Sequence, residues 1–248
     1  EELLFIEGIA PAWLASLSPA FSRMTGVDVA LSGSAQLEFD GEGRLREADL
    51  HLAGNEAAIN LPKIFQAPVE VKSLQADVRL REYGAEWQLD ELRLAFNDGG
   101  TVRVTGNAHR SKDGGAAEFA IVGQDFLVGT VHQFWPLPVS PPARDWVVKN
   151  IKSGKVPGLD ASMSADIGSI GTPLVLSNFK IDARFPVRDA TMSYRDPLPG
   201  ATEVDADARI TQSFFEAVIL KGTTAGMTVT GGKILIDGLD KGKGHELL

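Results

Sequence analysis

The stretch Val27-Asp28-Val29-Ala30-Leu31-Ser32-Gly33-Ser34-Ala35-Gln36-Leu37-Glu38-Phe39-Asp40 alternates between two kinds of side chain. Its odd positions are apolar or small, and its even positions are polar apart from Ala30. Successive side chains of a β-strand point to opposite faces of the sheet, so a period of two predicts a strand with one dry face. At about 3.3 Å per residue, such a strand spans roughly 40 Å.

The same alternation returns along most of the chain and predicts further strands. Its apolar positions are Ala48, Leu50 and Leu52; Leu74, Ala76, Val78 and Leu80; Leu92, Leu94 and Phe96; Phe179, Ile181, Ala183 and Phe185; and Val204, Ala206, Ala208 and Ile210. Asn97–Gly100 and Lys112–Gly115 carry Asp-Gly turn signals of the kind that join neighbouring strands. We therefore expect an antiparallel meander with one apolar and one wet face.

Two tryptophan-bearing segments break this alternation and predict helices. Pro11–Met24 has apolar residues spaced three or four apart and is followed by Gly26 as a stop signal. The second helix begins at a Ser140 cap, contains Trp146, and ends at Gly154. Each helix precedes a run of alternating residues, so the chain is expected to repeat a helix-plus-sheet unit.

An internal repeat supports this organisation, because four segments recur in the same order about 130 residues later. The paired segments are Val27–Phe39 with Leu159–Ile167, Arg46–Leu52 with Leu176–Asp182, Ser73–Leu80 with Glu203–Ile210, and Gly100–Gly106 with Gly226–Gly231. One such pair could arise by chance, whereas four in one order indicate duplication.

The predicted fold is therefore mostly β, with two repeats of long antiparallel sheet, each preceded by a short Trp-bearing helix. We assign residues 1–125 to the first helix-plus-sheet repeat and 126–157 to a helical connector. Residues 158–240 form the second sheet repeat, and 241–248 form a flexible tail.

Composition excludes several classes of function. The chain of 248 residues has a formal net charge of −9, which argues against neutralising the phosphates of a nucleic acid. It has no cysteine, so disulfides, thiolate metal sites and cysteine nucleophiles are excluded. No run of 18 apolar residues is present to form a transmembrane helix.

Catalytic signatures are also missing from the sequence. The four histidines, at positions 51, 109, 132 and 245, have no second ligand at metal-binding spacing. No nucleophile elbow and no phosphate-binding loop is present. Asp205 and Asp207 could suggest a pair of glycosidase carboxylates, but they alternate with apolar residues and fit a solvated strand face better. We therefore predict no enzyme activity, no catalytic residue, no metal and no cofactor.

Two further segments carry a resemblance to a known family. The stretch from Phe134-Trp135-Pro136 through Arg144-Asp145-Trp146 to Gly154 resembles the central region of YhdP-like proteins of the AsmA superfamily. That region has Trp-Pro, a short spacer, and an Arg-x-Trp helix. A second match runs from Phe185 to Tyr194 and is followed by Pro197 and Pro199. The resemblance is most specific over residues 130–238, and residues 1–110 resemble an earlier, more divergent copy.

The resemblance implies a fold and a function. AsmA-like proteins are anchored in the inner membrane of Gram-negative bacteria and extend through the periplasm. They build repeating, strongly curved sheets that form an open apolar groove and carry phospholipid toward the outer membrane. The chain is then expected to be one segment of such a bridge. Its partners would be phospholipid acyl chains, neighbouring repeats of the parent protein, and the inner membrane through an anchor absent from this sequence.

On this hypothesis the apolar side of the alternating runs lines the groove. The candidate lipid-binding residues are Val29, Leu31, Leu37, Phe39, Leu50, Leu52, Val78, Leu80, Leu94, Phe96, Phe179, Ile181, Phe185, Met192 and Ile210. The alternative is a closed β-sandwich that acts as a scaffold or interaction module of the cell envelope, with the same residues filling its core. A carbohydrate-binding β-domain is a weaker reading, because the chain has only two tyrosines.

Overall fold

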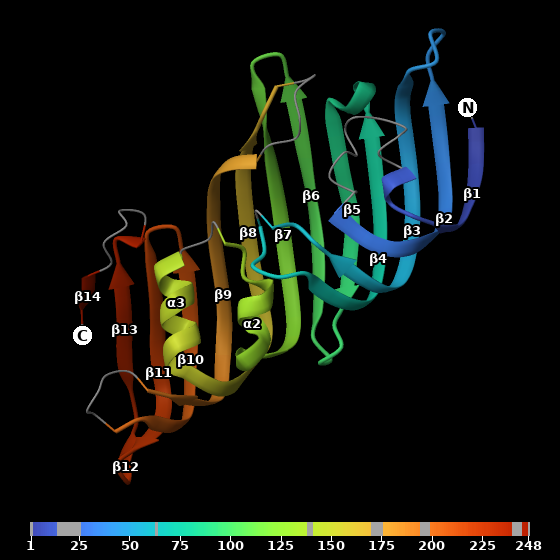
Figure 1. The fold of residues 1–248 in the computed structure, drawn as a ribbon. Coiled ribbons are helices and arrows are strands. Elements are labelled where there is room, and N and C mark those ends of the chain that lie inside the picture. Colours follow the sequence, from blue (N-terminus) through green and yellow to red (C-terminus); the bar gives the residue numbers. More distant parts are fainter. Residues whose placement is uncertain are drawn as a thin grey trace.

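A computed structural model describes residues 2–13, 26–62, 64–137, 141–169, 176–193, 199–239 and 245–247. These residues form one 14-stranded antiparallel sheet whose strand order follows the sequence, except that β12 pairs only with β11 (Figure 1). The strands are β1 (Glu2–Ile9), β2 (Val27–Phe39), β3 (Leu45–Ile59), β4 (Val69–Arg81), β5 (Glu86–Ala95), β6 (Thr101–Ser111), β7 (Gly114–Leu127), β8 (Ile151–Ile167), β9 (Leu176–Met192), β10 (Ala201–Thr211), β11 (Phe214–Thr224), β12 (Met227–Val229), β13 (Gly232–Asp237) and β14 (His245–Leu247). The helices are η2 (Glu82–Gly84), α2 (Val128–Phe134) and α3 (Pro141–Asn150).

The antiparallel meander predicted from alternation is confirmed. Strand β2 has the bounds of the alternating run Val27–Phe39, and the two predicted turns separate β5 from β6 and β6 from β7. The register keeps apolar residues on one face, since Ala35 lies opposite Leu50 and Leu50 lies opposite Val78. The described strands form a single sheet, so they include no second sheet that could close a sandwich.

The sheet does not divide into two, which differs from the prediction of separate sheet repeats. Strand β7 pairs with β8 along its whole length, so the expected halves are joined by an ordinary ladder of hydrogen bonds. The four pairs of similar segments fall on β2 and β8, β3 and β9, β4 and β10, and β6 and β12. A division into repeats stays a prediction, and residues 14–24 of the first Trp-bearing helix lie outside the described residues.

The second Trp-bearing helix ends earlier than expected. We predicted that it would stop at Gly154, but α3 ends at Asn150 and β8 begins at Ile151 without a loop. Gly154 lies inside β8 with a φ of +138°, and a Cβ there would lie 3.0 Å from Ala190. Close strand packing and the positive φ therefore require a glycine at this position. In the sequence alone, such a glycine looks the same as one that ends a helix. At the other end of the chain, His245–Leu247 pair with β13 where a flexible tail was expected.

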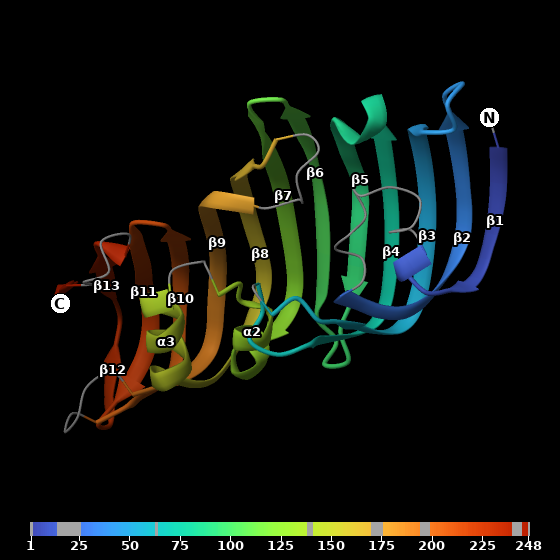
Figure 2. The same cartoon turned by 45° about the horizontal axis from the view of Figure 1, so that its top comes forward.

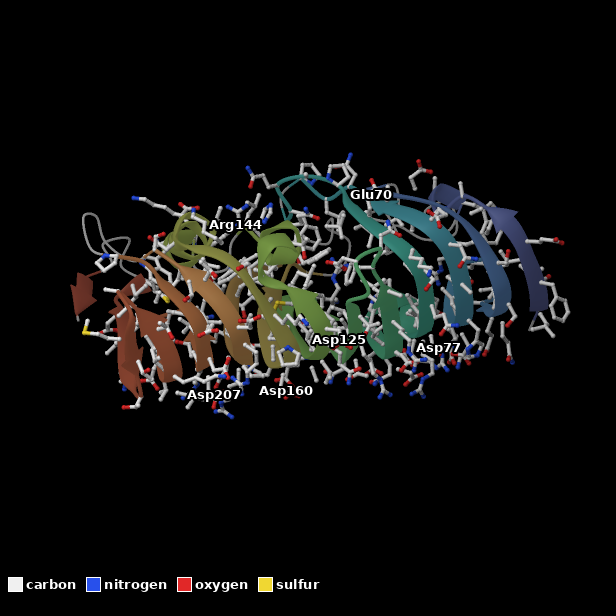
Figure 3. All side chains as sticks on the ribbon, turned by 90° about the horizontal axis from the view of Figure 1, so that it is seen from below. Glu70, Asp77, Asp125, Arg144, Asp160 and Asp207 are labelled. Carbon is white, nitrogen blue, oxygen red and sulfur yellow. The ribbon has the colours of Figure 1, made fainter. Side chains whose placement is uncertain are left out.

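The sheet is curved, and the α-helices α2 and α3 lie inside the curve. In Figures 1 and 2, α2 lies over β8, and α3 lies over the neighbouring strands β10 and β11. Figure 3 shows the sheet edge-on, with the helices on its concave side and a dense layer of polar side chains on the convex side. We call these the inner and outer faces. The β3–β4 connection, residues 60–62 and 64–68, also crosses the inner face and reaches the helical segment, where Leu137 N–H donates to Ile64 O at 2.7 Å (Figure 1).

Gly33 is required where β2 and β3 approach closely. Its φ is +151°, and a Cβ at this position would overlap the carbonyl oxygen of His51 on β3. Gly33→Ala is expected to lower the free energy of unfolding by about 2 kcal/mol or more, because strain and overpacking add. Gly41→Ala is the control, since nothing lies within 4 Å of that Cβ. Urea denaturation of both variants measures the difference, and equal stabilities would contradict this role of Gly33.

Candidate functional site

An unbroken row of apolar residues crosses the inner face from β2 to β13. Each member lies directly opposite the next in the strand register. The row consists of Gly33, Leu52, Ala76, Leu92, Val104, Ile121, Ala161, Ala183, Ile210, Phe215 and Ile236. Ten strand spacings of about 4.8 Å make this central row roughly 48 Å long. The row therefore runs across the strands, along the length of the sheet.

The central row is not uniformly buried. Leu52 near one end, and Ala183, Ile210, Phe215 and Ile236 near the other, are buried. Between them, the members from Ala76 to Ala161 are only half-buried. Apolar side chains that reach water over several adjacent strands lose the stabilisation that full burial would give them. The middle of the inner face thus has a continuous apolar contact surface to offer.

Neighbouring rows widen this region into what we call the apolar strip. It consists of fourteen of the half-buried apolar residues on the inner face of β4 to β9, namely Leu74, Ala76, Val78, Leu89, Leu92, Leu94, Val102, Val104, Phe119, Ile121, Leu159, Ala161, Met163 and Ile181. The strip is about 24 Å long across the strands, at about 4.8 Å per strand spacing. No ionisable side chain belongs to it.

The predicted lining residues divide between packed and accessible positions. Buried are Val29, Leu31, Leu37, Leu50, Leu52, Leu80, Phe96, Met192 and Ile210. Half-buried are Val78, Leu94, Phe179, Ile181 and Phe185, and Phe39 is 37% exposed at the end of β2. Of all these, Val78, Leu94 and Ile181 lie in the apolar strip.

Most of the strip was not among the predicted lining residues. Val102 and Val104 belong to a segment that was recognised as part of the repeat, and their alternation could have identified them. Phe119 and Ile121 were harder to find, because β7 also carries Val122, which is apolar and lies on the outer face with 43% exposure. An apolar residue on each face obscures the period of two on which the prediction depended.

One margin of the inner face is covered by segments distant in sequence. Phe134 of α2 packs against Phe96 and Phe126, with ring centroids 4.2 and 5.9 Å away. A Cβ at Gly100 would lie 2.9 Å from the Phe126 ring, so a glycine leaves room for this cluster. The guanidinium of Arg144 on α3 donates to Gln66 of the β3–β4 connection, which ties the two covering segments together. The cover and the apolar strip therefore share the inner face of the sheet.

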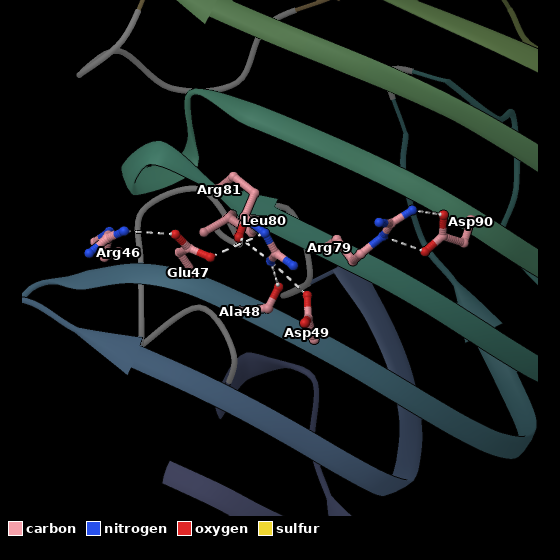
Figure 4. Close-up of polar contacts among 8 residues, drawn as sticks. All are labelled: Arg46, Glu47, Ala48, Asp49, Arg79, Leu80, Arg81 and Asp90. Atoms are coloured by element: carbon pink, nitrogen blue, oxygen red, sulfur yellow. Dashed lines mark hydrogen bonds and ion pairs between the residues drawn. The ribbon is translucent and has the colours of Figure 1, made fainter. Parts of the chain in front are cut away.

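On the outer face, a row of polar residues crosses the strands in the same direction as the central row. Directly opposed residues there are Gln36, Asp49, Arg79, Gln88, Asn107, Glu118, Ser164 and Lys180. Ion pairs between strands cross this face, including Arg79–Asp90 at 2.5 Å and Arg81–Asp49 at 2.6 Å (Figure 4). Figure 3 places Asp77, Asp160 and Asp207 on this convex side. The two faces of the sheet thus differ in chemistry, because the outer face carries charged side chains and the inner face carries apolar ones.

Asp182 shows how the outer face keeps its carboxylates charged. Arg209 donates two hydrogen bonds to this carboxylate, at 2.9 and 2.6 Å, and they lower its pKa against the opposing effect of partial burial. The stabilisation is present above the ordinary carboxyl pKa and is lost as the pH falls through the lowered value. Because the pair is partly exposed, it contributes about 1 kcal/mol or less.

Arg209→Gln should therefore raise the pKa of Asp182 toward its ordinary value and change stability only slightly. Carbon-detected NMR titration of the side-chain carboxyl measures the pKa directly. An unchanged Asp182 titration in this variant would show that Arg209 does not lower that pKa.

No metal-binding cluster is found in the described residues. They contain no group of three or more His, Cys, Asp or Glu side chains that could hold a metal ion. His51 pairs with Asp77 at 2.7 Å on the outer face, where both side chains are exposed. Among the helices of the described segments, none is long and apolar enough to cross a membrane.

A shallow depression of about 540 Å³ lies near the ends of β8 and β9. It is lined by Asp166, Asn178, Phe179, Lys180 and Gln212. Four of these five side chains are polar, and Lys180 belongs to the row of polar residues across the outer face. The depression therefore differs in chemistry from the apolar strip.

Comparison with known proteins gives one match. A protein-family model described as YhdP protein matches residues 25–247 of the 248 in the chain. No curated protein and no solved structure matches. The matched range includes every residue of the apolar strip.

Proposed function

Because the chain belongs to the YhdP protein family, we propose that it is a segment of a bridge-like lipid-transport protein whose apolar strip shelters phospholipid acyl chains. The parent protein would be anchored in the inner membrane, outside this sequence, and would extend through the periplasm of a Gram-negative cell. Phospholipid would move along it between the inner and outer membranes. The transfer involves no bond making or breaking, and so no enzyme activity.

The physical basis of the proposal is desolvation. A methylene group in water costs about 0.8 kcal/mol, so a 16-carbon chain costs roughly 13 kcal/mol if it crosses water bare. Apolar residues of the strip would replace much of that water, and they would gain burial themselves. A headgroup could stay in water above an open trough, because the strip lies on one face of an unclosed sheet.

The single observation that supports this function best is the direction of the central row. Its residues follow one another from strand to strand, so an acyl chain could move along the sheet without leaving apolar contacts. A core that served only stability would be buried throughout, whereas the row from Ala76 to Ala161 is half-buried. A binding surface that must accept and release many molecules requires such accessible positions.

Strand β1 supports the expected pairing with neighbouring segments of the parent protein. It is the first strand of the sheet and pairs only with β2 among the described strands. Leu3 and Phe5, which lie on the outer face of this strand, are 61% and 85% exposed. An exposed edge strand with free backbone groups is a template for another strand. We propose that a preceding segment continues the sheet here and extends the apolar track.

Native mass spectrometry tests the proposed function. The purified chain is incubated with phosphatidylethanolamine and phosphatidylglycerol vesicles, separated from them, and measured intact, with lipid phosphate assayed in parallel. We expect discrete phospholipid adducts. A folded chain that remains free of lipid after incubation would contradict the proposal and favour a scaffold or interaction role in the cell envelope.

A further inference from the structure

Helix α3 covers one end of the central row. Ala143 of α3 belongs to a buried cluster with Ala183, Ile210 and Phe215 of the row beneath it. Trp146 lies with its ring centroid 6.1 Å from that of Phe215. The row itself does not change chemistry at this point, since its covered members are as apolar as its half-buried ones. The accessible strip is therefore interrupted by a helix that lies on the same track.

The sheet is shaped to make room under this helix. On β9, β10 and β11, the cluster beneath α3 includes Ala183, Ala208 and Ala217. Ala208 and Ala217 lie in the row beside the central row, where the open strip carries the larger Leu94, Val102 and Leu159. Alanines leave a bay above the sheet, and α3 fills the volume that side chains fill elsewhere. Leu159, Ala161 and Ile181 of the strip pack against the same cluster, so bay and strip are continuous.

Helix α3 turns few apolar residues toward the interior. Its sequence, Pro141–Asn150, offers Ala143, Trp146 and Val147 to the interior, while Val148 is 47% exposed. At its C-terminal end it is joined directly to β8, and Ser193 N–H donates to Asn150 O at 2.8 Å. This end is fixed to the sheet, so a movement of α3 away from the bay would turn about Asn150 and would break the hydrogen bond from Arg144 to Gln66.

We propose that α3 is a displaceable plug and that the bay beneath it is a second acyl-chain site, lined by Ala183, Ala208, Ile210, Phe215, Ala217 and Ile236. This inference rests on the proposed function and identifies where transport along the sheet is gated. A lipid acyl chain arriving from the strip can replace the apolar side of α3 with contacts of the same kind. Burial of the bay is then preserved, and shelter gained by the acyl chain offsets the exposure of the apolar side of the helix.

A reversible disulfide tests the plug, because the chain has no native cysteine. Ala143→Cys is combined in turn with Ala183→Cys, Ala208→Cys and Ala217→Cys, and the pair that oxidises is used. We expect the oxidised protein to bind fewer phospholipids per chain than the same protein after reduction. Ala143→Cys alone, treated with the same oxidant, is the control. Equal loading of the oxidised and reduced forms overturns the proposal, and so does the absence of a cross-link in all three pairs.

A second pair of variants loosens the plug instead of locking it. Trp146→Ala removes the ring contact between α3 and Phe215 of the bay, whereas Val148→Ala changes the exposed side of the same helix. We expect Trp146→Ala to shift lipid loading toward higher occupancy at each vesicle concentration and Val148→Ala to leave it unchanged. Unchanged or reduced loading in a folded Trp146→Ala protein contradicts the plug.

The outcomes separate this inference from the function on which it rests. If neither the wild-type chain nor the reduced cysteine variant binds lipid, the proposed function fails and the plug fails with it. If lipid binds equally in the oxidised and reduced forms, the strip carries lipid and α3 is a fixed part of the fold.

Discussion

Ile121→Asp is expected to abolish phospholipid binding, whereas Val122→Asp is expected to leave it intact. The two residues are neighbours on β7 and point to opposite faces. Ile121 lies in the central row, opposite Val104 and Ala161. Val122 lies on the outer face, opposite Arg103 and Asp160, and is 43% exposed. One pair of substitutions thus places the same charge on either side of one strand.

The expected difference follows from desolvation of the new carboxylate. In the lipid-free chain an aspartate at position 121 still reaches water, because Ile121 is only half-buried, so the fold should tolerate it. An acyl chain resting on the strip would remove that water, and burying an unpaired charge costs at least several kcal/mol. At position 122 the carboxylate stays solvated beside Arg103 whether or not lipid is bound.

Native mass spectrometry and a lipid phosphate assay measure binding, and circular dichroism shows that both variants are folded. Retained binding in Ile121→Asp would place the lipid elsewhere. Equal loss in both variants would mean that added charge, and not the face on which it lies, prevents binding.

Leu80→Ala should cause one of the largest losses of stability that a single side-chain truncation can produce in this chain. Leu80 is fully buried on β4, opposite Ala48 and Trp87, within the main apolar cluster. Removing buried leucine atoms costs about 2–5 kcal/mol through lost transfer energy and the cavity left behind. Urea denaturation of the variant and the wild type measures this change in the free energy of unfolding.

Leu92→Ala is the matched control, because Leu92 lies on the adjacent strand in the half-buried strip. Truncating a half-buried leucine should cost about 1 kcal/mol or less, since only part of its surface is removed from water on folding. The same variant should reduce lipid binding, whereas Leu80→Ala should affect binding only through stability. Similar losses of stability at both positions would indicate that the strip is ordinary core.

Much of the fold was predictable from local patterns. The bounds of β2 and the turns before and after β6 follow from alternation and Asp-Gly signals. Gly154 misled the prediction because a glycine looks the same whether it ends a helix or permits a positive φ inside a strand. The pairing of β7 with β8 was also missed, since the helical segment between them suggested a boundary between two sheets.

The candidate site was predictable only in kind. Alternation identified a continuous apolar face, and three predicted lining residues, Val78, Leu94 and Ile181, lie in the apolar strip. Most of the other predicted lining residues follow the same alternating pattern but are buried in the structure. Their periodicity is identical, so periodicity could not distinguish a packed position from an accessible one.

The sequence by itself determined that this protein is a long antiparallel sheet with opposite chemistry on its two faces. It could do so because side-chain direction in a strand depends only on the parity of the residue number. Only the tertiary structure decided which apolar residues are covered and which remain accessible. Cover comes from α2, α3 and the β3–β4 connection, which reach the inner face through contacts between residues such as Arg144 and Gln66 that are far apart in the chain. Burial is a property of such long-range contacts, and no local pattern records them.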